Sequence, residues 1–324
     1  MRDIVFKLLF FFRIHILFQN LNKYQPRVIV FHSVTKKNKK DILNKFIHAS
    51  IDDFAEQIKY LVKNYNMVSL DKIHQHFEGV KTCKENSVAI IIDDGFSNFY
   101  ENIYPITKSY NIPIATAINC DRINNQQIPW DVMLSMLITL KGNNTKDDFD
   151  TLSKNFLNMN SNMRKKFKNQ MKYKLNEHSV NPFEIDPDLR ALTYKQIEKL
   201  NNDKNISFLS HGLSHDPINA LETKIAKREL ISSKKKIEEL TSKRCDVFVY
   251  PQGKYDSNLV KLVKNAGYRY AYTVDHGFIY KQDNRLLLKR INIPPFSSFE
   301  EFICRLSGIG IVFSALFRIR RTLN

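Results

Sequence analysis

Short apolar runs recur along the chain, and each of them stops at a polar or turn residue. Runs of this length, rich in Ile, Val, Phe and Tyr, predict buried β-strands. The stretches between most of them have helical periodicity, as around Phe54, Ile58, Leu61 and Val62, which would share one helix face. Strands alternating with helices predict a parallel sheet, and seven such units predict a barrel or a doubly wound sheet. The seven predicted strands are Val28–Phe31, Val88–Ile92, Ile112–Ile118, Ile206–Leu209, Val247–Tyr250, Tyr270–Val274 and Leu286–Ile293.

The interval from about residue 121 to residue 190 breaks this alternation. It contains Trp130-Asp131, an apolar segment up to Leu140 and then a long Lys- and Asn-rich region with helical character. We predict a mostly helical insertion between the third and fourth strands, and not a separate catalytic domain. Trp130 and Asp131 would either cap a pocket or simply start a helix whose N-terminus favours the acid.

Polar or turn residues follow five of the seven predicted strands, and a charged residue lies within a sixth. In a parallel α/β fold the carboxyl ends of the strands converge on one face, where active sites are built. Residues far apart in the sequence are therefore expected to meet in one pocket. The residues at these strand ends are His32, Asp93 and Asp94, His211, Pro251-Gln252-Gly253, His276 and Arg290, the last of which lies within the seventh run.

The second strand ends at the adjacent carboxylates Asp93 and Asp94. Neighbouring side chains on a strand end point in different directions, so one acid can bind a metal while the other handles a proton. His211 and His215, four residues apart, can supply neutral nitrogens to the same metal. This pattern predicts a metal-assisted reaction.

Length and charge limit the class of protein. A chain of 324 residues can form one large domain and bury a sizeable core. The net charge of +17 calls for an acidic partner such as anionic lipid, anionic glycan or nucleic acid, or else reflects a solvated lysine surface. Nucleic acid is excluded from the prediction because no arginine-rich helix, zinc-knuckle spacing or aromatic RNA-binding signature is present.

The cysteines and the ends of the chain bear on location. The four cysteines are far apart without CxxC spacing, which predicts reduced thiols and favours the cytoplasm. No stretch has ~20 uncharged apolar residues. Residues 1–25 and 301–324 are apolar and basic, and they flank a central domain of residues 26–300. Each end is predicted either to lie as an amphipathic helix on the inner, anionic face of the cytoplasmic membrane or to pack on the central domain.

Three motifs in order resemble those of the polysaccharide deacetylases, carbohydrate esterase family four. They are Ile92-Asp93-Asp94-Gly95, the His211-x-x-x-His215 segment, and Tyr250-Pro251-Gln252-Gly253, and the Tyr-Pro-x-Gly form points to one branch of the family. The resemblance implies a distorted seven-stranded (β/α) barrel that removes N-acetyl, or less often O-acetyl, groups from sugars with a divalent metal, usually zinc.

The resemblance also assigns roles. Asp93 would be the general base, and Asp94, His211 and His215 would bind the metal. The backbone N–H of Gln252, after Pro251, would hold the oxyanion at a turn that Gly253 permits. Tyr250 would line the sugar pocket, and Ser214 would steady the turn that carries the histidines.

Two departures from the usual family pattern concern the base and the acid. Val249 stands where many members have the arginine that holds the base, so Arg290 is the candidate for orienting Asp93; the alternative is a salt bridge on the barrel rim. No late His-Asp motif is visible, so we rank His32 before His276 as the general acid.

The sequence therefore predicts a metal-dependent deacetylase acting on an acetylated polysaccharide or lipid-linked saccharide. The main alternative is a catalytically weak or inactive saccharide-binding member of the same fold. A glycosidase that uses Asp93 is disfavoured because it would leave His211 and His215 without a role.

Overall fold

The computed structural model describes residues 2–37, 47–125, 127–140, 146–179 and 181–311. Within them, seven parallel strands close into a barrel, because β1 pairs with β10 on one side and with β5 on the other. The predicted seven-stranded barrel is confirmed, although Ile112, Tyr250 and Leu286 lie outside the strands in which they were placed. The barrel strands are β1 (Arg27–Phe31), β5 (Ser87–Ile92), β6 (Ile114–Ile118), β7 (Ile206–Ser210), β8 (Val247–Val249), β9 (Tyr270–His276) and β10 (Leu288–Asn292).

The barrel strands are apolar on both faces, which is why they appear in the sequence as unbroken hydrophobic runs. In β5, Ala89 and Ile91 pack in one core together with β6 and β8, while Ile90 and Ile92 pack in a second core with the surrounding helices. The first of these cores contains small side chains such as Ala115 and Ala117, as expected for the narrow interior of a barrel.

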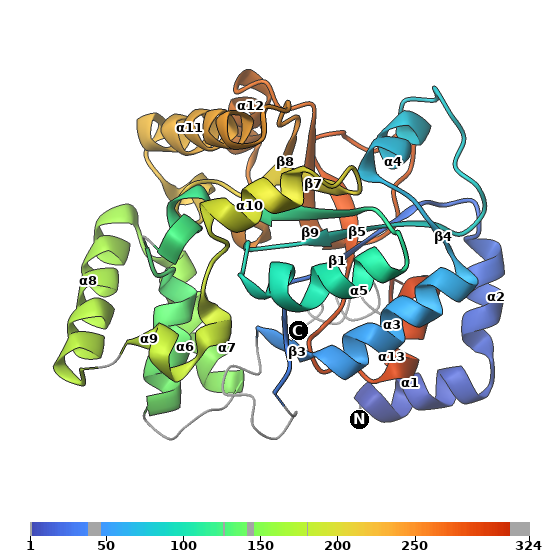
Figure 1. Ribbon diagram of the computed structural model, residues 1–324, viewed down its shortest axis with the longest axis horizontal. Coiled ribbons are helices and arrows are strands. Elements are labelled where there is room, and N and C mark those ends of the chain that lie inside the picture. Colours follow the sequence, from blue (N-terminus) through green and yellow to red (C-terminus); the bar gives the residue numbers. More distant parts are fainter. Residues whose placement is uncertain (1, 38–46, 126, 141–145, 180, 312–324) are drawn as a thin grey trace, which may run out of the picture.

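Helices surround the barrel, as Figure 1 shows. In α3 (Ile51–Asn64) the side chains of Phe54, Ile58 and Leu61 are fully buried, whereas Val62 is 37% exposed and does not belong to the predicted face. The other barrel helices are α4 (Leu70–Phe77), α5 (Tyr104–Ser109) after the π-helical η1 (Phe99–Ile103), α10 (Tyr194–Asn201), α11 (Thr223–Thr241) and α12 (Ser257–Asn265).

The segment between β6 and β7 is mostly helical, as predicted. Its helices lie together on the side of the barrel opposite α1 and α2 (Figure 1) and have their own apolar core, in which Trp130 stacks on Phe156 at 4.1 Å between ring centroids. The elements are η2 (Cys120–Asn125), α6 (Trp130–Leu140), α7 (Lys146–Asn158), α8 (Ser161–Glu177), α9 (Pro182–Ile185) and η3 (Pro187–Leu189).

Three short strands were not predicted, because elements of two or three residues leave no periodic signal. β2 (Ser33–Thr35) pairs with β3 (His48–Ser50), and β4 (Asn66–Met67) pairs with the start of β5. His48 bonds to Ser33 on one side and to Asp186 at 3.1 Å on the other, so the loop after β1 is tied to the end of the insertion.

The N-terminal segment forms α1 (Arg2–Phe11) and α2 (Ile14–Leu21), which pack against α13 (Phe299–Ser307) near the end of the described chain. Residues 312–324, the main part of the predicted C-terminal helix, lie outside the described residues, and the domain limits at 25 and 300 stay predictions. No single described helix is long and apolar enough to span a membrane; α1 and α2 satisfy that test only as a pair, bent by 80°. All four cysteines are free thiols.

Candidate active site

The three predicted metal ligands meet at the carboxyl ends of β5 and β7, two barrel strands that are separated by β6. Asp94 follows β5, while His211 and His215 lie in the loop after β7. Asp94 Oδ1 lies 3.4 Å from His211 Nε2 and 3.2 Å from His215 Nε2. One ligand atom from each residue falls within 4.8 Å of the other two, and all three side chains are buried.

Hydrogen bonding determines which nitrogen of His211 faces Asp94. His211 Nδ1 lies 2.8 Å from the carbonyl oxygen of Val249, which can only accept, so Nδ1 carries the proton and Nε2 presents a lone pair. Asp94 Oδ1 is a buried acceptor without a hydrogen-bond donor among the described residues. Two buried acceptors that face each other repel unless a cation lies between them, so this donor set fits a divalent metal.

His215 has a second carboxylate on its other side. Asp131, from the first turn of α6, places Oδ2 3.2 Å from His215 Nδ1. Burial alone would lower the pKa of His215, but Asp131 and Asp94 raise it to about 9. Asp131 Oδ1 also accepts the Val132 N–H at 3.0 Å. Asp131 therefore starts the helix and also reaches into the site, which combines the two predicted roles.

The second acid, Asp93, is held by Arg290. Arg290 Nη1 donates to Asp93 Oδ1 at 2.8 Å, and Arg290 Nε donates to the Thr273 carbonyl at 2.8 Å. Both charged side chains are almost fully buried. Burial would raise the pKa of Asp93, but Arg290, and then His211 and His32, hold it below the usual value. The pair lies inside the barrel, not on its rim, and Asp93 is ionised opposite a fixed cation.

Left-handed backbone conformations cluster in the site. Asp94, His215 and Gln252 have φ of 72°, 64° and 56°. A non-glycine residue in this region costs about 1–3 kcal/mol and persists only where its surroundings hold it. These turns aim the side chains away from the directions that strand alternation would give.

Glu229, on α11, holds the loop that carries the two histidines. Its carboxylate accepts the Leu213 N–H at 2.7 Å, the Ser214 N–H at 3.2 Å and the Ser214 hydroxyl at 2.8 Å. Burial raises the pKa of Glu229. Ser214 thus contributes to the turn as predicted, through a partner that the sequence did not identify.

Arg122 and Asn119, which follow β6, also belong to the site and were missed. Arg122 donates to the Asp94 carbonyl at 3.0 Å and to the Leu189 carbonyl at 3.3 Å, and its guanidinium lies 4.3 Å from the ring centroid of Phe96. Asn119 donates to the His211 carbonyl. Both lie in the segment that follows the third predicted strand, where the convergence of strand ends would place residues of the site.

The Tyr250–Gly253 turn packs tightly beside β9. A Cβ on Gly253, whose φ is 62°, would lie 2.1 Å from Val274 Cγ2, so glycine is required for both conformation and space. Pro251 is buried, and Gln252 Nε2 lies 3.3 Å from His215 Nε2. The ring of Tyr250 is fully buried and its hydroxyl donates to the Leu286 carbonyl at 3.1 Å. This corrects the expectation that Tyr250 lines the sugar pocket: its ring is part of the core and supports the turn.

The two candidate general acids have different surroundings. His32, at the end of β1, is partly exposed and near enough to lower the pKa of both Asp93 and Asp94. His276 instead lies against the chain after α13, since a Cβ on Gly310 would be 3.1 Å from its Nε2. Burial lowers the pKa of His276 to about 4, so it is a poor proton donor. The geometry favours His32.

Comparison with known proteins identifies the family and the fold. A family model described as polysaccharide deacetylase matches residues 80–271. A poly-beta-1,6-N-acetyl-D-glucosamine N-deacetylase of Staphylococcus aureus is 23% identical over 290 residues, which is 86% of this chain and 81% of the relative. The solved deacetylase PplD of Streptococcus pyogenes, in complex with acetate, has a TM-score of 0.61 at 16% identity, covering 87% of this chain and 98% of that chain. A de-N-acetylase of Aggregatibacter actinomycetemcomitans has a TM-score of 0.59 at 19% identity, covering 86% and 99%.

Proposed function

Because this chain belongs to the polysaccharide deacetylase family, we propose that it hydrolyses N-acetyl groups of a glycan with the help of a bound divalent metal ion. The chain is a hydrolase of amide bonds other than peptide bonds. The observation that supports metal dependence is that Asp94 Oδ1 and the lone pair of His211 Nε2 face each other at 3.4 Å. Two histidines and one carboxylate make zinc the expected ion.

When bound, the ion would supply Lewis-acid chemistry, lowering the pKa of water and polarising the acetyl carbonyl. Asp93 would act as the general base. Its pKa lies below the usual value, so it is ionised at neutral pH and can take the proton of the attacking water. Arg290 orients the carboxylate through Nη1 and leaves Asp93 Oδ2 for that proton.

The chain's own groups would complete the reaction. The negative charge that develops on the acetyl oxygen would be held by the backbone N–H of Gln252, for which the described residues provide no hydrogen-bond acceptor. His32 would donate a proton to the leaving nitrogen as the carbon–nitrogen bond breaks. The products are a free amine on the sugar and acetate, with water consumed.

The proposed substrate is a glycan that contains N-acetylhexosamine. This follows from the activity named for the Staphylococcus aureus relative, poly-beta-1,6-N-acetyl-D-glucosamine N-deacetylation. The inactive saccharide-binding alternative is disfavoured because base, ligands and orienting arginine are all present together.

Acetate release from an N-acetylglucosamine oligomer tests this proposal. We expect Asp93→Asn to retain about one metal ion per chain and lose acetate release, and His211→Ala to lose the metal itself. His178→Ala, which changes an exposed histidine on the insertion, is the matched control and should behave as wild type. If the wild-type protein binds no metal after incubation with zinc, the metal site is refuted. If it binds metal and releases no acetate, the saccharide-binding alternative is favoured.

A further inference from the structure

The helix pair α1–α2 has one side on the protein and one side in solvent. On the inner side, Phe6 is buried against Cys304 and Ile309. On the outer side lie apolar side chains that are each more than half exposed, and we call them the N-terminal apolar patch. They are Ile4, Leu8, Phe11, Phe12, Leu17 and Leu21.

This exposure is concentrated in one place. Among the described residues, 21 large apolar side chains are exposed, and eight of them fall between Ile4 and Tyr24. Single exposed apolar side chains are ordinary, but a contiguous patch marks a surface that is covered by a partner.

The shape of the helix pair distinguishes lying on a membrane from crossing it. The two helices meet at an 80° bend at Arg13, whose φ is 55°. At 1.5 Å per residue, α1 and α2 are about 15 Å and about 12 Å long, well short of the ~30 Å hydrocarbon core. Two short helices set at this angle can both rest their outer sides in the plane of an interface.

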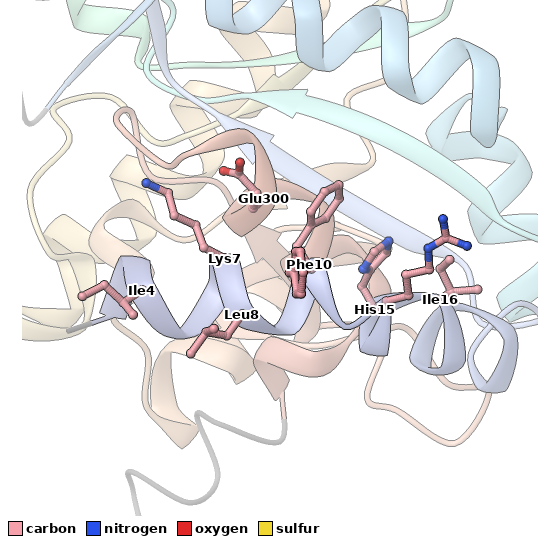
Figure 2. Close-up of a pocket in the computed structure, with 9 residues that line it drawn as sticks. Ile4, Lys7, Leu8, Phe10, His15, Ile16 and Glu300 are labelled. Atoms are coloured by element: carbon pink, nitrogen blue, oxygen red, sulfur yellow. The ribbon is translucent and has the colours of Figure 1, made fainter.

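Arg13 is a charged group beside the patch that an anionic surface would attract, whereas Lys7 is already paired with an acid. Arg13 is exposed at the bend, and no carboxylate pairs with it in the described part of the chain, while Lys7 bonds to Asp3 at 3.0 Å. Both cations border a hollow of about 920 Å³, with Glu300 on its rim. Figure 2 shows Lys7 and Glu300 above α1, with Leu8 on the opposite side of the helix.

We infer that the N-terminal apolar patch docks the protein onto a bilayer that contains anionic phospholipid, with Arg13 at the headgroup phosphates. The apolar side chains would supply buried area, and the chain's net charge of +17 would strengthen the attraction to the surface. The patch is separate from the proposed metal site, so docking does not depend on the proposed reaction.

Tryptophan fluorescence can test this directly, because the chain has a single tryptophan, Trp130, and it is buried. We expect the emission of Phe11→Trp and of Leu17→Trp to shift to shorter wavelength on addition of phosphatidylglycerol-containing vesicles. Val80→Trp, a matched control at a residue that is 68% exposed and outside the patch, should not shift. Brominated acyl chains should quench the first two variants and not the third.

Flotation with vesicles measures the affinity. The full chain should bind vesicles containing phosphatidylglycerol more tightly than pure phosphatidylcholine vesicles. Arg13→Gln should weaken binding about fivefold, as expected for one basic residue at the surface. A Leu8→Ser, Phe11→Ser, Leu17→Ser variant should weaken it at least about tenfold while keeping its metal affinity and melting temperature.

Three results would overturn the inference. The first is equal vesicle binding by the wild type and the triple variant. The second is an absence of binding together with a concentration-dependent dimer that the triple variant loses, which would assign the patch to a second copy. The third concerns the emission of Phe11→Trp: it would already be at short wavelength before vesicles are added, and vesicles would leave it unchanged. That result would mean that residues 312–324 or another copy already cover the patch.

Discussion

Replacement of Asp131 by asparagine tests whether the insertion takes part in metal binding. Asp131 Oδ2 lies 3.2 Å from His215 Nδ1, and water does not screen the interaction because His215 is buried. Asparagine keeps the shape and the Oδ1 acceptor for the Val132 N–H, so the start of α6 should survive. The variant therefore removes the charge that orients His215 and little else.

The size of the effect follows from two opposing terms. Loss of a carboxylate behind a metal-ligating histidine typically costs 10–100-fold in metal affinity, or about 1.4–2.7 kcal/mol. The same carboxylate, together with Asp94, raises the pKa of His215 to about 9, so its removal also weakens competition from the proton. We therefore expect the lower part of the range, about tenfold, near neutral pH.

Zinc affinity measured by competition with a chromophoric chelator is the appropriate assay, with the melting temperature of the metal-free protein measured alongside. Asp150→Asn removes the same charge from an exposed position of the insertion and should leave zinc affinity unchanged. If Asp131→Asn binds zinc as tightly as wild type, the residue serves only the helix start. If the melting temperature alone falls, the contact with His215 is structural.

Three further predictions concern other parts of the barrel. Arg290→Met leaves the Asp93 carboxylate buried without its partner, so urea unfolding should show a free energy of unfolding lower by about 3–5 kcal/mol. The acidic limb of the pH–activity profile should move to higher pH because the pKa of Asp93 rises. An unchanged acidic limb would contradict the orienting role of Arg290. Gly253→Ala should lower the free energy of unfolding by about 2–5 kcal/mol, and adding Val274→Ala should restore the part due to the clash but not the part due to the left-handed backbone. Burial lowers the pKa of His74 from 6.5 to about 3. Between pH 6.5 and about pH 3 the folded state therefore binds fewer protons than the unfolded state, so the free energy of unfolding should fall as the pH drops through this range. His74→Phe should flatten that pH dependence, and a slope equal to that of the wild type would show that other groups cause it.

The fold could be predicted because its strands carry their signal locally. Strands buried on both faces appear as continuous apolar runs, and these runs alternate with amphipathic helices. β2, β3 and β4 could not be predicted, because two or three residues fix neither a period nor a partner. Cytoplasmic location and the domain limits at 25 and 300 stay predictions.

Some of the site followed from position in the sequence and some did not. Asp94 and His211 lie just after strand ends, with His215 further along the same loop as His211, and parallel strands bring such ends together. The burial of Tyr250 was missed because the strand ends one residue earlier, at Val249, so its side-chain direction is set by the turn.

The sequence by itself determined which chemical groups arrive at the carboxyl end of the barrel, because that depends on local strand signals and on the rule that parallel strands share one direction. The tertiary structure decided which partners these groups meet: Arg290 was a candidate for Asp93 only through the family resemblance, and the contact of His215 with Asp131 was not predicted. Arg290 reaches Asp93 across 197 positions, and Asp131 reaches His215 from an insertion. The physical reason is that a buried charge takes whichever opposite charge the packing brings within a few ångströms, and left-handed turns at Asp94 and His215 set the side-chain directions. Neither the packing distance nor those turns can be read from local sequence preference.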